Sequence, residues 1–197
     1  MVKGILLTFP VKLLKSNLKF RFLTIPAPVK VRILSHKNTN IMILITGATG
    51  NIGTALTKQL AAQGIAFRAL VRSPKHIAGA DTVIGDMSDK DSLIKALQGV
   101  EKAFLLTNSS EEAEQLQSNF VAAAAIAGVK HIVKLSQFAA SKHSPVRFMR
   151  YHAAIEEKIM QSGMAYTFLR PNLFMQGLLG FADLIKHTHQ FYASMHQ

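Results

Sequence analysis

Three glycines, Gly47, Gly50 and Gly53, follow a short apolar run and precede a stretch with the apolar spacing of a helix. This order predicts a strand, a tight turn and a helix. Glycine permits the positive φ that such a turn needs, and its missing Cβ atom allows close approach of a phosphate and of the strand. The unpaired N–H groups and the dipole of a helix's first turn attract an anion. We therefore expect a dinucleotide pyrophosphate here, held by Gly47, Thr49, Gly50, Asn51, Ile52 and Gly53.

A glycine triplet alone is weak evidence, and the alternative is a glycine-rich connection that binds nothing. The end of the second expected strand indicates which dinucleotide would bind. NAD-binding domains usually carry an acidic residue there, whereas this chain carries Arg72 and, close behind it, Lys75. A guanidinium can hold a 2′-phosphate through paired hydrogen bonds. We therefore expect NADP(H) rather than NAD, the alternative being a solvated basic turn.

Asp86 follows the third expected strand, between Gly85 and Met87. Its carboxylate has two uses, accepting a hydrogen bond from the adenine amino group or stabilising a turn, for which Asp is well suited. The pattern favours neither.

From Ile41 onward, short apolar segments alternate with longer amphipathic ones. Such alternation is typical of parallel strands joined by helices that cover both faces of a sheet. Together with the glycine turn it predicts an α/β, doubly wound Rossmann fold whose ligands bind at the carboxyl ends of the strands. The expected strands are 41–45, 66–71, 82–84, 102–106, 131–135 and 165–169, and the expected helices are 52–63, 89–98, 111–127 and 148–161.

Positive charge is concentrated in the first 40 residues. They carry eight of the 23 Lys and Arg residues and none of the 11 acidic ones, so residues 41–197 have a surplus of only four. We therefore expect no nucleic-acid partner for the domain, which we assign to residues 41–197. For residues 1–40 the alternatives are a non-native extension, an organellar transit or membrane-surface segment, and a nucleic-acid arm, and the charge pattern does not separate them.

Composition excludes some chemistry. The chain has no cysteine, so disulfides and thiolate catalysis are excluded. His187, His189 and His196 lack a carboxylate frame, so we expect no metal site. The longest apolar run of the first 40 residues, 4–9, is much shorter than the roughly 20 residues that span a bilayer. We expect a cytoplasmic protein, with organellar targeting by residues 1–40 as the open alternative.

Seven segments carry a family resemblance: Thr46-Gly-Ala-Thr-Gly-Asn-Ile-Gly53, Leu70-Val-Arg-Ser73, Gly85-Asp86, His131-Ile-Val-Lys-Leu-Ser136, Ser162-Gly163, Tyr166-Thr-Phe-Leu-Arg-Pro171 and Asn172-Leu-Phe-Met-Gln176. Together they resemble the NmrA-like atypical short-chain dehydrogenases/reductases, and within that family the bacterial NAD(P)H:quinone oxidoreductases. The resemblance implies an NADP-preferring Rossmann domain and a smaller C-terminal portion that closes over the substrate. Because the chain stops at Gln197, we expect that substrate portion to be truncated.

The Tyr-x-x-x-Lys pair of short-chain dehydrogenases makes a tyrosine proton available to a carbonyl oxygen. It is absent here, because Ile155 stands four residues after Tyr151. His152 occupies the place where reductase relatives carry Lys or His. We expect it either to donate a proton or to contact the nicotinamide ribose, with Glu156, one turn away, either holding it or facing solvent.

Two strand ends supply further candidates. Ser136 follows the fifth strand where the resemblance places a catalytic serine, and the alternative is a plain turn serine. Thr107 and Asn108 end the fourth strand. Because ligands bind at the carboxyl ends of strands in this fold, we expect both to border the nicotinamide.

These residues lead to an NADPH-dependent oxidoreductase that transfers hydride to a quinone or a similar small electrophile, the proton coming from water or His152. The alternative is a non-catalytic NADP-sensing regulatory protein, which would tolerate the loss of Tyr-x-x-x-Lys. A third hypothesis is that the truncated chain is inactive and forms aggregates or a homodimer through uncovered apolar surface.

Overall fold

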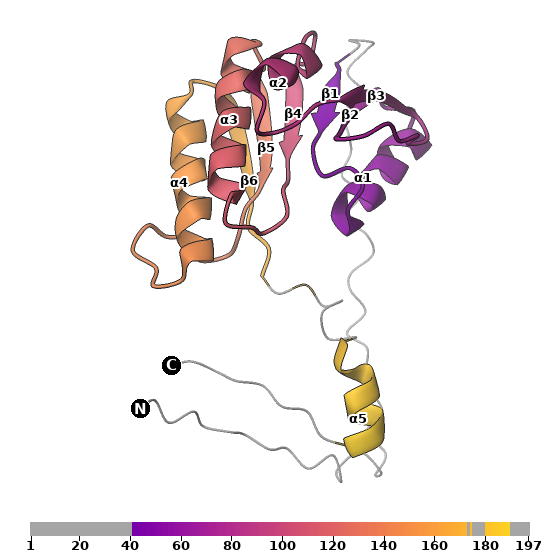
Figure 1. Cartoon of the computed structure of the whole chain (residues 1–197), viewed down its shortest axis with the longest axis vertical. Coiled ribbons are helices and arrows are strands. Elements are labelled where there is room, and N and C mark those ends of the chain that lie inside the picture. Colours follow the sequence, from indigo (N-terminus) through magenta and orange to yellow (C-terminus); the bar gives the residue numbers. More distant parts are fainter. Residues whose placement is uncertain (1–40, 173, 175–179, 190–197) are drawn as a thin grey trace. The chain divides into compact units, whose positions relative to one another are not determined.

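The computed structural model describes residues 41–172, 174 and 180–189 and contains the predicted parallel sheet (Figure 1). Its strands lie in the order β3-β2-β1-β4-β5-β6, and each pairs in parallel with its neighbours. The prediction of a doubly wound α/β fold is confirmed. The strands are β1 (Ile43–Ile45), β2 (Phe67–Val71), β3 (Ala80–Ile84), β4 (Lys102–Leu105), β5 (His131–Leu135) and β6 (Ala165–Leu169), and the helices are α1 (Asn51–Ala62), α2 (Lys90–Ala96), α3 (Ala113–Ile126), α4 (Arg147–Gln161) and α5 (Ala182–Thr188).

Helices cover both faces of the sheet, because successive strand residues point to opposite sides. On one face, α1 packs against a core that contains Ile45 and Phe67. On the other face, α2, α3 and α4 pack against a core that contains Leu44 and Phe120. Figure 1 shows α1 on one side of the strands and α3 and α4 on the other.

Strand β5 places an unusual residue in the second core. Ile132 and Lys134 are both fully buried, while Val133 packs on the α1 side of the sheet. Lysine is almost never fully buried unless it has a partner. The alternation of β5 therefore carries a charged side chain to a position beneath α4.

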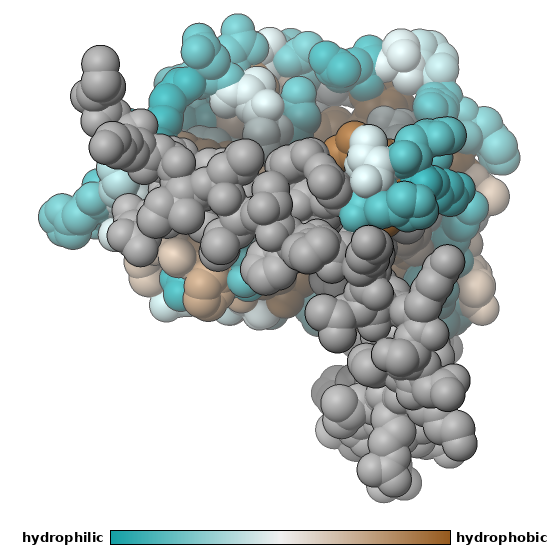
Figure 2. Space-filling model, turned by 90° about the horizontal axis from the view of Figure 1, so that it is seen from below, coloured by the Kyte–Doolittle hydropathy of each residue, from teal (hydrophilic) through white to brown (hydrophobic). Residues whose placement is uncertain are grey.

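Strand β6 ends the sheet on one side and is little covered. Four of its five residues are exposed, among them the large apolar residues Tyr166 and Leu169. Figure 2, seen from below the view of Figure 1, shows apolar residues beside hydrophilic ones on that lower face of the molecule. An uncovered apolar edge is a surface on which more protein can pack.

The predicted ends of the elements agree with the structure within two residues. At the start of α2, Asp89 is the N-cap, and its carboxylate accepts hydrogen bonds from the backbone nitrogens of Asp91 and Ser92. The compact unit that holds the sheet ends at Asn172, and α5, which was not predicted, belongs to a second unit. In the described ranges no helix has the length and apolar character needed to cross a membrane. The interpretations of residues 1–40 lie outside the described residues.

Candidate active site

The glycine turn has the geometry that its sequence predicts. Gly47 has a φ of +63°, and a Cβ atom there would lie 2.9 Å from the carbonyl oxygen of Leu106. A Cβ atom on Gly53 would lie 2.0 Å from the carbonyl oxygen of Gly47, so only glycine lets α1 approach the turn this closely. A Cβ atom on Gly50 would have no neighbour nearer than 3.5 Å, which leaves space for a ligand at this position.

The first turn of α1 is suited to bind an anion. Its N-cap, Gly50, supplies no side-chain hydrogen bond, and the turn contains no acidic residue. Within the described part of the chain, the backbone N–H groups of Asn51, Ile52 and Gly53 have no hydrogen-bond partner. The side chains of Thr49 and Asn51 are exposed next to them. Free amides at the positive end of a helix dipole fit a pyrophosphate, so the residues present fit a dinucleotide.

A groove of about 450 Å³ lies beside α1 and next to the glycine turn. Thr49 and Lys75 both line it, so the structure brings these two predicted residues together. Lys58 and His76 line it as well. The groove therefore offers cationic side chains close to the unpaired amides, which favours a ligand with more than one phosphate.

Arg72, the other cationic residue predicted to bind the 2′-phosphate, is exposed and lies just after β2. Its charge acts on Asp86, whose Oδ1 atom accepts hydrogen bonds from the backbone nitrogen and the hydroxyl of Ser88, both at 2.7 Å. These two hydrogen bonds, with a smaller contribution from Arg72, hold the pKa of Asp86 below its ordinary value. Asp86 thus stabilises a turn, and its contact with adenine stays a prediction.

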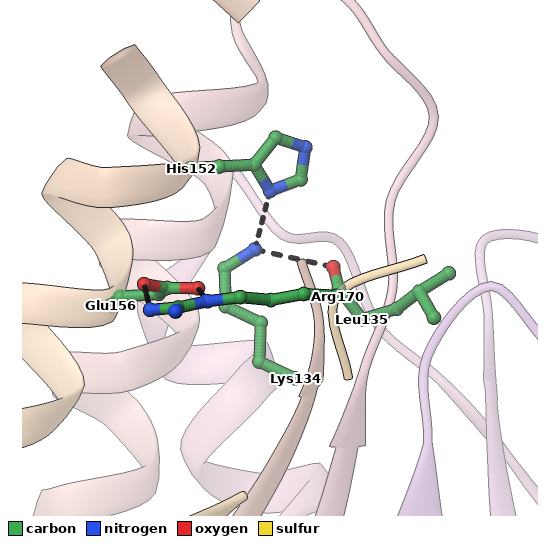
Figure 3. A network of polar contacts seen from close by, with 5 residues as sticks. All are labelled: Lys134, Leu135, His152, Glu156 and Arg170. Atoms are coloured by element: carbon green, nitrogen blue, oxygen red, sulfur yellow. Dashed lines mark hydrogen bonds and ion pairs between the residues drawn. The ribbon is translucent and has the colours of Figure 1, made fainter. Parts of the chain in front are cut away.

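The carboxyl end of β5 and helix α4 enclose a polar network (Figure 3). The Nζ atom of Lys134 lies 2.8 Å from Nδ1 of His152 and 3.2 Å from the carbonyl oxygen of Leu135. Arg170, after β6, donates to Glu156 from Nε to Oε1 at 2.9 Å and from Nη2 to Oε2 at 2.5 Å. The exposed fractions of Lys134, His152 and Glu156 are 0%, 6% and 3%, so these three side chains are shielded from water, whereas the side chain of Arg170 is 51% exposed.

Burial determines which groups of this network are protonated at pH 7. Burial lowers the pKa of Lys134 to about 8, against the opposing effect of Glu156. Burial and, after it, the charge of Lys134 lower the pKa of His152 to about 4. His152 is therefore a neutral imidazole at pH 7. Because its Nδ1 faces an ammonium group, which can only donate, Nδ1 is the acceptor and the proton lies on Nε2.

Glu156 neither holds His152 nor faces solvent, so both expectations for it were wrong. Burial alone would raise its pKa, but the hydrogen bonds of Arg170 and Ser136, together with the charges of Arg170 and Lys134, outweigh burial and hold the pKa below its ordinary value. The ion pair forms because β6 ends beside α4. The spacing of residues along the helix gives no sign of this packing. Glu156 is a carboxylate committed to Arg170 rather than a partner of the imidazole.

Ser136 directly follows β5 and is 3% exposed. Its hydroxyl lies within reach of the Glu156 carboxylate and helps to lower the pKa of that group, although its Oγ atom makes no well-aligned hydrogen bond within the described ranges. At the end of the neighbouring strand, Thr107 accepts a hydrogen bond from Gln117 at 2.8 Å, and Asn108 is exposed.

Aromatic rings surround His152. Phe148 meets its imidazole edge to face at 4.8 Å between ring centroids, and Tyr151 stacks on it at 4.4 Å. Phe148 and His152 are four residues apart, which is the spacing of Tyr-x-x-x-Lys. Phe148 has no proton to give, so His152 is the member of this spaced pair that carries a transferable proton. Burial raises the pKa of the Tyr151 hydroxyl, against a weaker effect of Ser109.

Sequence reasoning missed Lys134, Arg170 and Phe148 as members of the site. A signal existed for two of them. Lys134 stands two residues after Ile132 on a predicted strand, which places both on one face. Phe148 precedes His152 by one helical turn, which places their side chains together. The pairing of Arg170 with Glu156 had no local signal, because it depends on how β6 and α4 pack.

A model of the NmrA-like family matches residues 39–195 of the chain. Among curated proteins, an NAD(P)H azoreductase from Xenophilus azovorans is 36% identical over 156 residues, which cover 77% of this chain and 54% of that protein. The chain thus spans about half the length of the curated relatives it matches.

Two solved structures of reductases are also similar to this chain. The NADPH-dependent quinone oxidoreductase of Escherichia coli, in complex with NADPH, is 33% identical, with a TM-score of 0.65, and the match covers 75% of this chain and 55% of that one. The triphenylmethane reductase of a Citrobacter species, in complex with NADP(H), is 28% identical, with a TM-score of 0.66 and the same two coverages.

Proposed function

The chain belongs to the NmrA-like family, and from that premise we propose that it is an NADPH-dependent oxidoreductase that delivers hydride to a quinone or a similar electron-poor small molecule. The observation that carries the proposal is the set of unpaired amides at residues 51–53, below a turn that only glycine can make. That geometry is suited to a pyrophosphate, and the enclosed His152 supplies a proton donor on the same chain.

Two observations support NADP(H) over NAD. Arg72 ends β2 in the place of an acidic residue, and Lys75 lines the groove beside α1. A 2′-phosphate gains from both cations, whereas a free ribose hydroxyl gains little. The quinone oxidoreductase and triphenylmethane reductase structures that match this chain contain NADPH and NADP(H).

When bound, the cofactor supplies the hydride. The chain's own residues hold the pyrophosphate at Gly47, Gly50 and Gly53, and present the Nε2 proton of His152 for the substrate oxygen. The hydroxyl of Ser136, which also lies within reach of Glu156, can donate a hydrogen bond to that same oxygen, and the burial of Lys134 and His152 limits competition from water. A reduced quinone oxygen needs one proton, so no tyrosine acid is required.

The names of the matching proteins favour a reductase over the NADP-sensing alternative. The test is NADPH oxidation by the 197-residue chain with a panel of quinones and without them. We expect oxidation that depends on a quinone and is faster with NADPH than with NADH. Tight binding of NADPH without any quinone-dependent oxidation would support the sensor instead.

Three further expectations belong to this proposal. The exposed apolar residues of β6 favour either a homodimer or a covering C-terminal portion, as in a longer protein. The expectation of no nucleic-acid partner agrees with the small charge surplus of residues 41–197, and a cytoplasmic location stays a prediction. Sedimentation of the full chain tests the homodimer, because a monomer at micromolar concentration would contradict it.

A further inference from the structure

We propose that Lys134 is the positioning residue of this site: it fixes His152 in the tautomer that carries its proton on Nε2, and it supplies a proton to Nδ1 while Nε2 donates. The inference rests on the proposed reduction of a quinone-like substrate and names the group that would regulate proton delivery in it.

The geometry of Lys134 supports this role. Its side chain is fully buried, and its Nζ atom donates to Nδ1 of His152 at 2.8 Å and to the carbonyl oxygen of Leu135 at 3.2 Å. An ammonium group has three donors and no acceptor, so Nδ1 must accept. Figure 3 shows the second ring nitrogen of His152 on the side of the ring that faces away from Lys134. No residue of the described ranges makes a hydrogen bond to that nitrogen.

The neighbouring charges leave this contact undisturbed. The groups that face Lys134 are His152 and Glu156 from α4, with Tyr151 stacked on the imidazole and Arg170 reaching in after β6. Both oxygens of Glu156 accept hydrogen bonds from Arg170 and its pKa is held below the ordinary value, so the carboxylate is a weak base toward the lysine proton. It still stabilises the ammonium form through space, because its charge raises the pKa of Lys134.

The proposed step balances atoms and electrons. Hydride transfer from the cofactor reduces the quinone by two electrons and leaves a hydroquinone anion. The Nε2–H bond of His152 then breaks as an O–H bond forms on the substrate oxygen. At the same time Nδ1 takes a proton from Nζ of Lys134, so the imidazole stays neutral and the amine becomes neutral. A proton from water then binds Nε2 and Nδ1 returns its proton to Nζ of Lys134, which restores the starting tautomer and the ammonium group before the next turnover. The pKa of Lys134, about 8, lets that exchange occur near neutral pH.

The test begins with ¹⁵N NMR of the histidine side chains in the full chain, without cofactor. Loss of signals in His152→Gln identifies the resonances of His152. Lys134→Gln keeps a donor to Nδ1 and removes the mobile proton, whereas Lys134→Met removes both. Lys130→Met is the matched control, because Lys130 lies just before β5 with its side chain 76% exposed.

We expect the wild type and Lys134→Gln to show the proton on Nε2. In Lys134→Met and Lys134→Gln the protonation midpoint of His152 should rise by about one pH unit or more, because a nearby positive charge is gone. Lys130→Met should match the wild type. A wild type with the proton on Nδ1, or a midpoint that Lys134→Met leaves unchanged, overturns the inference.

Turnover supplies the second readout. In the wild type, kcat should fall as pH rises above about 8, where Lys134 loses its proton. Both Lys134 variants should lose this alkaline decline and show kcat reduced about 10-fold or more, with KM for NADPH little changed. A decline that persists in Lys134→Met overturns the inference. A wild type that shows the Lys134-dependent NMR behaviour but never oxidises NADPH overturns the proposed function, while it supports the positioning contact.

Discussion

A Cβ atom on Gly53 would lie 2.0 Å from the carbonyl oxygen of Gly47, whereas one on Gly50 would have its nearest neighbour at 3.5 Å. The two glycines therefore have separable tasks. Gly53 is needed for α1 to pack against the turn. Gly50 is needed only where a ligand approaches the backbone.

This separation predicts different results for two alanine substitutions. Gly53→Ala should lower the free energy of unfolding by about 1–3 kcal/mol, because the turn must shift to admit the methyl group. Gly50→Ala should cost less than about 1 kcal/mol. Both should weaken NADPH binding by about 10-fold or more, since each 1.4 kcal/mol is a factor of ten. Denaturant unfolding and calorimetric titration measure the two effects, and normal NADPH affinity in Gly50→Ala would contradict the pyrophosphate position.

Arg72→Asp should weaken NADPH binding about 10-fold or more and change NADH binding much less. A carboxylate at this position repels a 2′-phosphate, which NADH lacks. Lys90→Asp makes the same charge change at an exposed position in the first turn of α2 and should affect neither cofactor. Equal losses for NADPH and NADH in Arg72→Asp would remove the basis for the cofactor preference.

His152→Ala should slow turnover about 100-fold, because general acid catalysis contributes about 10²–10⁴. Its NADPH dissociation constant should change much less. Tyr151→Phe is the control, since it keeps the ring that stacks on the imidazole and removes only the hydroxyl. If Tyr151→Phe abolished turnover while His152→Ala did not, the tyrosine would be the proton donor. A loss of affinity alone in His152→Ala would make it a ribose contact.

Because Lys134 is buried, the free energy of unfolding should change with pH in the alkaline range. Its pKa is lowered from the ordinary 10.5 to about 8, so the unfolded chain binds more protons between those values. Stability contributed by this group therefore rises with pH across that window, and its burial as an ammonium is destabilising below pH 8. Lys134→Met should remove this rise and should be the more stable protein at pH 7, by roughly 3 kcal/mol at most. Urea unfolding at pH 7, 8.5 and 10 checks it, and parallel curves for both proteins would contradict it.

The fold could be predicted because its signals are local. The alternation of apolar and amphipathic segments fixes parallel strands and covering helices, and the glycine turn is a backbone requirement within seven residues, Gly47 to Gly53. The polar network around His152 was harder to predict from the sequence. Glu156 was placed by helical spacing beside His152, yet tertiary packing brings it to Arg170, 14 residues away. Residues that meet because different elements pack together have no characteristic spacing in the sequence. A lysine on a strand is also expected to be solvated unless the face of the sheet on which it lies is considered.

The central claim is that a pyrophosphate lies on the free amides at the start of α1. Calorimetric titration of the folded 197-residue chain with NADPH, and separately with NADH, tests it most directly. We predict saturable binding of NADPH at one site per chain, tighter than that of NADH, and weakened in Gly50→Ala. A folded chain that binds neither nucleotide would contradict the account.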